Sequence, residues 1–356
     1  MRTVAVRAGL LCAVVLVAAA LGQAGDPRLV RATGTALIML VLVLGLNIFI
    51  GNSGVFSFGH LAFMGVGAYV TVIARMSEAQ KSFQLPGLPG GLAGLELSGP
   101  MAVLVSGAVA AACAAVLAGP VVRLSGLTAS LATFAILIAA NSVFENWETV
   151  TRGSAGLILD ADPPGIWTLV LWACLAVVVA TGFQRTRTGV RLTASREDEI
   201  AARAVGIRVW AERGAAFVLS AFVVGAAGSL FAQYFSSLNP DSFFLTLTFT
   251  AIAILVVGGL TTVSGAVAGT LVVSVALELL RLVERGVYLG GWKVPSRSGL
   301  AEVGLALVLL GVLVVRPLGI TGGHEIDRLL RRRRPRPRRP ETPAPEEEHG
   351  HPARTA

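Results

Sequence analysis

The sequence predicts an all-α fold, a polytopic transmembrane bundle of about ten helices. Of its 356 residues, 54% are hydrophobic and only 14% are charged, and the mean hydropathy is +0.74. A helix that crosses a bilayer needs about 20 mostly apolar residues, because its backbone polar groups must be satisfied within the helix. Apolar stretches of that length recur along most of the chain, so the composition excludes an ordinary soluble domain.

Ten apolar segments are expected to cross the membrane. The first could also be a cleaved signal peptide, since Arg2 and Arg7 precede its apolar core. The third is rich in glycine and polar residues, so we expect it to be partly unwound or re-entrant. The segments lie at about 8–25, 33–51, 54–74, 100–122, 124–143, 165–183, 214–236, 244–262, 264–283 and 299–316.

The charges predict two regions and an orientation. A membrane domain at 1–320 is followed by a tail at 321–356, which begins basic and then becomes rich in Pro and Glu, a composition typical of disorder. Residues 331–339 of the tail and the seven arginines of the loop at 184–213 predict that both termini lie on the cytoplasmic side of the membrane. The basic cluster can attract membrane lipid, but a topology anchor explains it more simply, and no nucleic-acid partner is expected.

The sequence gives little support for metal, redox or proton-coupled chemistry. The three cysteines and four histidines are scattered without ligand spacing. Acidic residues fall near segment ends, whereas a proton-driven carrier needs titratable groups deep in the bundle. Only His60 lies there, and a neutral imidazole satisfied by neighbouring groups is the simpler interpretation. We expect no catalytic residues, metal or bound cofactor.

Small and polar uncharged residues gather in two of the segments. Such residues can line a path for a small solute, although helix packing explains them about as well. The candidates for the path are Asn47, Asn52, Ser53, Ser57, His60, Thr128, Ser130, Thr133 and Asn141.

The basic loop at 184–213 is too long and too charged for a simple connection. We expect a short helix that is capped by Ser195, carries Glu197, Asp198 and Glu199 in its first turn, and ends at Gly206. Its small apolar face would dock in a groove of another protein. The alternative is a solvated helical hairpin without a partner. The face comprises Ala201, Ala202, Ala204 and Val205.

Three stretches, in the same order, resemble the permeases of branched-chain amino-acid ABC importers, specifically the LivM-like subunit. They are GNSGVFSFGHLAFMGVGAY at 51–69, the helix and loop at 124–157, and TGVRLTASREDEIAARAVGIRV at 188–209 with its continuation to 269. The resemblance covers about 35–320 and implies an ABC importer permease architecture.

In these permeases a Glu-Ala-Ala-x-x-x-Gly element couples the loop to ATPase subunits. Ile200 stands here where the family has that Glu, which puts the role of the Glu in doubt. The expected coupling residues are Glu197, Asp198, Glu199, Ala201, Ala202, Arg203 and Gly206.

The resemblance implies a subunit that is not an enzyme. It would pair with a second, LivH-like permease, two cytoplasmic ATPase subunits that bind the ATP, and an extracytoplasmic solute-binding protein. The chain itself has no GxxxxGK[ST] phosphate loop. Urea or amides, sugars and other amino acids remain alternative solutes, and an ion-coupled secondary carrier is the rival class.

Overall fold

A computed structural model describes residues 2–284, 288–289, 292–293, 299–316 and 319–322. The predicted tail lies almost entirely outside the described residues. The long apolar helices are α1 (Arg2–Gln23), α2 (Pro27–Leu46), α3 (His60–Arg75), α6 (Gly99–Val121), α7 (Gly126–Asn146), α9 (Ile166–Phe183), α12 (Val209–Phe235), α13 (Leu245–Gly258), α14 (Val263–Glu284) and α15 (Leu300–Val315).

The shorter elements lie between these helices. They are the π-helical turn η1 (Asn47–Gly51), α4 (Glu78–Gln84), α5 (Gly90–Ala93), α8 (Glu148–Thr151), the 3-10 turns η2 (Gly153–Ala155) and η3 (Pro240–Phe243), α10 (Arg187–Glu197), α11 (Glu199–Ala204), and the strands β1 (Leu157–Ile158), β2 (Ser237–Leu238), β3 (Tyr288–Leu289) and β4 (Trp292–Lys293).

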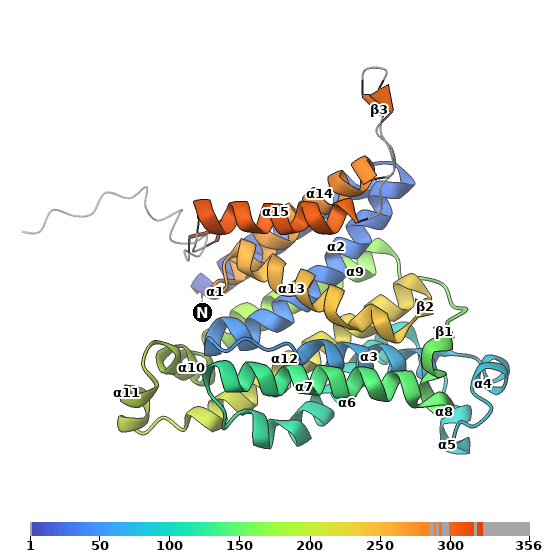
Figure 1. The fold of residues 1–356 in the computed structure, drawn as a ribbon, viewed down its shortest axis with the longest axis horizontal. Helices are drawn as coiled ribbons and strands as arrows, with labels where there is room; N and C mark the ends of the chain where they lie inside the picture. The colour runs from blue at the N-terminus through green and yellow to red at the C-terminus, as the bar shows by residue number, and fades with distance from the viewer. Residues whose placement is uncertain (1, 285–287, 290–291, 294–298, 317–318, 323–356) are drawn as a thin grey trace, which may run out of the picture.

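The bundle has two distinct ends (Figure 1). Helices α10 and α11 form one end, and α4, α5, α8, β1 and β2 form the other. Eight helical stretches of the described residues, one of them formed by η3 and α13 together, are long and apolar enough to cross a membrane. Helices α3 and α15 complete the ten predicted segments. The chain is therefore a multi-pass helical membrane protein, and α1 begins at the same end as α10 and α11.

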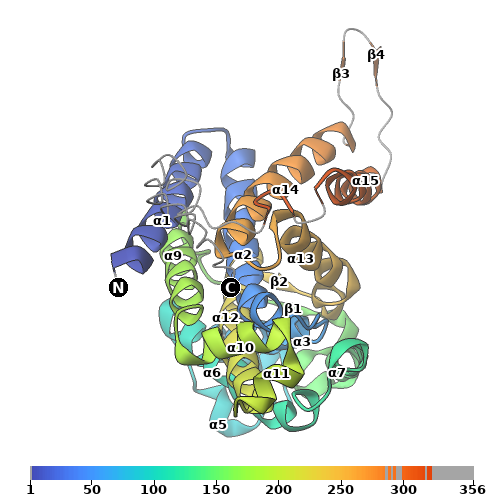
Figure 2. The ribbon, with the colours of Figure 1, turned by 90° about the vertical axis from the view of Figure 1, so that its left-hand side faces the viewer.

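Helices α2 and α12 lie near the middle of the bundle (Figure 2). Helices α3 and α6 pack against α12, and glycines let these three helices approach closely. A Cβ at Gly228 of α12 would lie 2.0 Å from the carbonyl oxygen of Met64 on α3. The Thr71 hydroxyl bonds to Ser106 at 2.7 Å and to Ser229 at 2.6 Å, so one buried polar cluster joins the three helices. Small residues at helix interfaces permit this packing in a membrane, where no hydrophobic force drives the helices together.

The third predicted segment is partly unwound, as expected. The helical path of α2 continues through η1 to Ser53, residues 54–57 have no helical structure, and α3 begins only at His60. We call residues 54–59 the unwound segment. All but Gly54, Phe56 and Phe58 are buried within the protein, where non-helical backbone can be satisfied.

The end opposite α10 and α11 is an ordered layer of short elements. Strands β1 and β2 pair antiparallel, with Leu157 opposite Leu238. Gln84 of α4 bonds to both backbone polar groups of Ile158, at 2.8 and 3.0 Å. The ammonium of Lys81 donates to three backbone carbonyls between Leu92 and Leu95. These bonds fix two long connections, at 76–99 and 144–164, as one surface.

Candidate functional site

Two helices rather than one make up the loop at 184–213. Thr186 caps α10 by accepting the Gly189 N–H at 3.1 Å. Asp198 caps α11 by accepting the Ala201 N–H at 2.9 Å. The predicted cap at Ser195 is wrong: its hydroxyl donates to the Leu192 carbonyl inside α10 at 2.8 Å.

The error has a physical cause. Asp caps a helix as well as Ser does, and the extended backbone of Asp198 interrupts the helical conformation between α10 and α11. Thr186 caps α10, which begins at Arg187, eight residues before Ser195. Glu197 therefore ends α10 and Glu199 begins α11, so the three acidic residues do not share a first turn. We call residues 184–208 the α10–α11 segment.

Gly206 ends α11, as predicted. The Ile207 N–H donates to the Ala202 carbonyl at 3.0 Å, and the Gly206 N–H donates to the Arg203 carbonyl at 3.0 Å. This pair of bonds is a Schellman motif, which needs a left-handed residue after the helix. The φ of Gly206 is +86°, a conformation that glycine adopts without strain.

Glu199 fixes α11 to the membrane helices. Its carboxylate accepts hydrogen bonds from Arg203 and, at 2.8 Å, from Arg213 of α12, whose side chain is only 6% exposed. Arg213 also contacts the Leu124 carbonyl in the connection between α6 and α7, at 3.4 Å. Burial acts to raise the pKa of Glu199, but the hydrogen bonds and charges of Arg213 and Arg203 outweigh it and lower that pKa.

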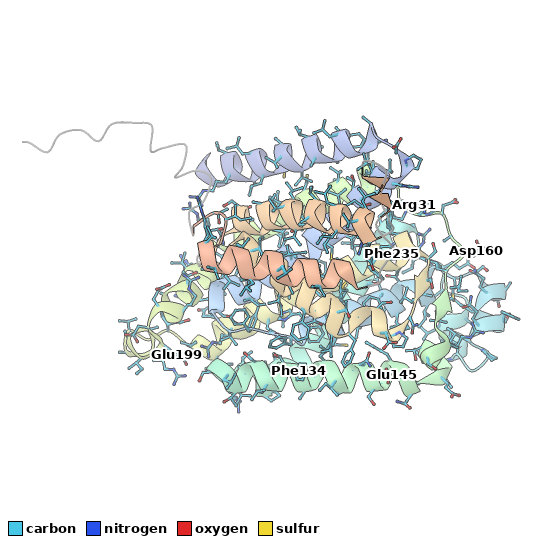
Figure 3. The ribbon with its side chains drawn as sticks, turned by 45° about the horizontal axis from the view of Figure 1, so that its top comes forward. Arg31, Phe134, Glu145, Asp160, Glu199 and Phe235 are labelled. Atoms are coloured by element: carbon cyan, nitrogen blue, oxygen red, sulfur yellow. The ribbon has the colours of Figure 1, made fainter. Side chains whose placement is uncertain are left out.

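One face of α11 points away from the protein. Ile200 is 83% exposed and Val205 is 77% exposed, and Ala201 and Ala204 lie beside them. Ala202, which the sequence placed on the same face, is instead buried against the chain. Figure 3 shows Glu199 at this end of the bundle, far from Glu145 and Asp160 at the other. The outward face of α11 is therefore apolar, small and without a covering element among the described residues.

Arg196 connects the α10–α11 segment to the break after α2. Its Nη1 donates to the Gly51 carbonyl at 2.6 Å. Its aliphatic stem lies over Gly54, where an added Cβ would be 2.6 Å from Cγ of Arg196. Thr193, one turn earlier, contacts Oδ1 of Asn52 at 3.4 Å. The same guanidinium also pairs with Glu197.

Helix α7 holds the unwound segment from the other side. The Ser130 hydroxyl donates to the Phe56 carbonyl at 2.9 Å, and the Phe58 N–H donates to the Thr133 hydroxyl at 3.2 Å. His60 is fully buried, and its Nδ1 lies 2.7 Å from the Ser57 hydroxyl. The two bonds from α7 satisfy backbone groups that the lost helix leaves free.

The structure brings seven of the nine path candidates together around the break. Asn47 donates to the Leu260 carbonyl at 2.8 Å, while Asn52 and Ser53 donate to carbonyls one turn back. Thr128 is exposed near the start of α7, and Asn141 donates to Glu145 near its other end. A role in a solute path stays a prediction for all nine.

Three important residues, Arg196, Arg213 and Gly54, escaped the sequence analysis. Nothing local distinguishes Arg196 or Arg213 from the other arginines of the loop, since their partners are remote in sequence. The aromatic surroundings of His60 come likewise from distant segments, with the ring of Phe217 centred 5.0 Å away. Gly54 gave the one usable signal, because glycine after a helix often marks a left-handed residue.

This fold defines a polytopic membrane protein in which a short helix with an exposed apolar face, α11, is fixed at one end of the bundle. The family model for the permease component of the branched-chain amino acid transport system matches residues 28–315, and the chain belongs to that family. The solved structures contain no match.

Curated relatives include both kinds of permease named in this family. The LivM permease protein of the high-affinity branched-chain amino acid transport system is 29% identical in Salmonella typhimurium and 28% in Escherichia coli K12, over 69% of this chain. The LivH permease protein of Escherichia coli K12 is 25% identical over 81% of this chain and 92% of its own length. The chain spans only 62% of the length of these LivM relatives.

Proposed function

We propose that this chain is a membrane-spanning permease subunit of an ABC importer for branched-chain amino acids. The observation that carries the proposal is the exposed apolar face of α11, which is tied through α10 and Arg196 to the break after α2. An exposed apolar face at the end of a membrane bundle suits a protein partner. Family membership and the LivM and LivH names of its relatives support the same function.

The partners follow from the proposal. A second, LivH-like permease would complete the path, and two ATPase subunits would bind ATP and dock on α11. A solute-binding protein would deliver the amino acid to the opposite end. The end that carries α10 and α11 would then face the cytoplasm, with both termini of the chain, in a bacterial inner membrane.

Coupling would be mechanical in this assignment. Movement of an ATPase displaces α11, and Glu199 and Arg213 transmit the displacement to α12. Arg196 transmits it to Gly51 and to Gly54 in the unwound segment, next to the path candidates. Mechanical coupling of this kind needs two discrete arrangements of packed elements rather than a titrating group inside the membrane.

The test begins with co-purification of the full chain from its native membrane. Two ATPases and a second permease should accompany it, and a leucine-loaded binding protein should stimulate ATP hydrolysis by the complex. Ile200→Asp should remove the ATPases and stop uptake, because a buried unpaired carboxylate is costly in an interface. Val190→Asp on α10 is the matched control, since Val190 is also exposed, at 56%, but lies on the other helix.

Two outcomes would contradict the proposal. One is a chain that arrives alone and transports alone. The other is equal ATPase capture by the Ile200→Asp and Val190→Asp variants. Uptake of urea or a sugar in place of leucine by the intact complex would change the solute and leave the importer class in place.

A further inference from the structure

A basic cavity lies beside α11, at the level where two membrane helices end. It measures about 350 Å³ and is lined by residues just after α6, before α12 and in the first turns of α12. Its lining comprises Val122, Arg123, Arg203, Ile207, Arg208, Val209, Trp210 and Arg213. Four of these eight residues are arginines, and the fold assembles them from two separate stretches of the chain, 122–123 and 203–213.

The positive charge of the cavity is only partly compensated. Glu199 pairs with Arg203 and Arg213, whereas Arg123 and Arg208 form no ion pair among the described residues. Glu212, a nearby carboxylate, is engaged with Arg191 at 3.1 Å. The four guanidinium groups thus face one carboxylate.

Arg213 is under-satisfied as well as buried. It is 5% exposed, and its Nε makes no hydrogen bond among the described residues. A buried cation is stable only when its charge is compensated, and one shared carboxylate does that incompletely. Nε itself is shielded, so an anion in the cavity would compensate the charge of the group rather than bind that N–H.

We propose that this cavity binds a phosphate group. Guanidinium groups present forked N–H donors that match phosphate oxygens, and several of them around one anion form charge-assisted hydrogen bonds. A phospholipid head group and a soluble phosphate ester share this chemistry. The proposal goes beyond the importer function and requires only that the chain spans a membrane.

The position of the cavity favours a lipid as the source. Val122 directly follows α6, and Trp210 lies in the first turn of α12, so the cavity is at head-group depth. Trp210 is 56% exposed, and tryptophan residues gather at membrane interfaces. Basic pockets between membrane helices on the cytoplasmic side bind acidic head groups.

The experiment places the full chain in lipid nanodiscs of phosphatidylcholine with a minor fraction of phosphatidylglycerol, and counts retained lipids by native mass spectrometry. Arg123→Gln/Arg208→Gln should lower phosphatidylglycerol retention roughly tenfold or more, because each basic residue contributes to the attraction. This variant leaves the Glu199 pairs intact. Arg185→Gln/Arg187→Gln is the control, since it removes two exposed arginines from the same loop outside the cavity.

A second arm identifies the source of the phosphate. Inorganic phosphate and glycerol phosphate are titrated calorimetrically into the chain in detergent. Selective retention of phosphatidylglycerol supports a lipid site. Soluble phosphate binding that is lost in Arg123→Gln/Arg208→Gln supports a soluble ligand. The proposal is overturned if neither probe distinguishes this variant from the control while circular dichroism shows both folded.

Discussion

The guanidinium of Arg196 donates a 2.6 Å hydrogen bond to the carbonyl of Gly51, although the two residues lie 145 positions apart in the chain. Gly51 ends the π-helical turn after α2, where carbonyls lose their helical partners. A side chain of α10 therefore satisfies a backbone group at the break in a membrane helix. Any displacement of α10 must either carry Gly51 with it or break this bond.

Replacing Arg196 by Gln should uncouple ATP hydrolysis from uptake in the assembled complex. The shorter neutral side chain loses the bond to Gly51, and hydrogen bonds to charged groups contribute roughly 1.5–3 kcal/mol. Uptake per ATP hydrolysed is the measurement. Arg191→Gln is the control, because it removes another arginine of α10, which pairs with Glu212, and leaves the bond of Arg196 to Gly51 intact. An unchanged ratio in the Arg196 variant would refute the link.

Gly54→Ala should destabilise the same junction for two separate reasons. The φ of Gly54 is +72°, which costs an L-residue roughly 1–2 kcal/mol, and the new Cβ would lie 2.6 Å from Cγ of Arg196. Thermal unfolding in detergent should show a lower midpoint. Gly214→Ala in α12 is the control, since no atom lies within 4 Å of its added Cβ.

The two causes can be separated by a double variant. Arg196→Ala removes Cγ and so should relieve the clash of Gly54→Ala but leave the backbone strain. The two substitutions should therefore be less than additive in the unfolding midpoint. Full additivity would show that Arg196 does not cover Gly54.

Hydrophobic length and glycine content were sufficient to predict the bundle and its break. The ten apolar segments and the unwound start of α3 follow from local composition, which a membrane constrains strongly. The positions of Arg196 and Arg213 do not follow from it. Each arginine of the loop has the same local chemistry, and only packing decides which one is buried and which is exposed.

The cap at Ser195 was mispredicted for a related reason. Ser195 and Asp198 are both good caps and stand three residues apart, so local propensity could not choose between them. The choice depended on Thr186, which starts α10 early enough to place Ser195 inside a helix. No second candidate competed with Gly206 for the end of the helix, and its position there was predicted correctly.

Gly206→Ala should loosen the end of α11 without any steric clash. No atom lies within 4 Å of an added Cβ, so the cost of roughly 1–2 kcal/mol is conformational and comes from the φ of +86°. Hydrogen exchange of the Ile207 amide, which bonds to Ala202, should become faster. Gly206→Asn should restore part of the protection, because Asn tolerates the left-handed region better. Equal exchange in both variants would contradict this account.

Glu199 should make the packing of α11 against α12 dependent on pH. Because Arg213 and Arg203 hold its pKa below the ordinary value of 4.5 in the folded state, the unfolded state binds the proton more readily. The contribution of Glu199 to the stability of the folded state is then fully present above pH 4.5. It is lost as the pH falls through the lowered folded-state pKa of Glu199. Glu199→Gln removes the charge at every pH.

The measurement compares hydrogen exchange in α11 for the wild type and Glu199→Gln at neutral pH and well below 4.5. Protection should differ at neutral pH, where the charged hydrogen bonds to Arg203 and Arg213 are intact. The difference should shrink at low pH, because the wild-type carboxylate is then protonated as well. Glu197→Gln serves as the control, since Glu197 is 71% exposed and an exposed pair contributes little. A gap between wild type and Glu199→Gln that persists unchanged at low pH would show that packing, rather than the Glu199 charge, holds α11 on α12.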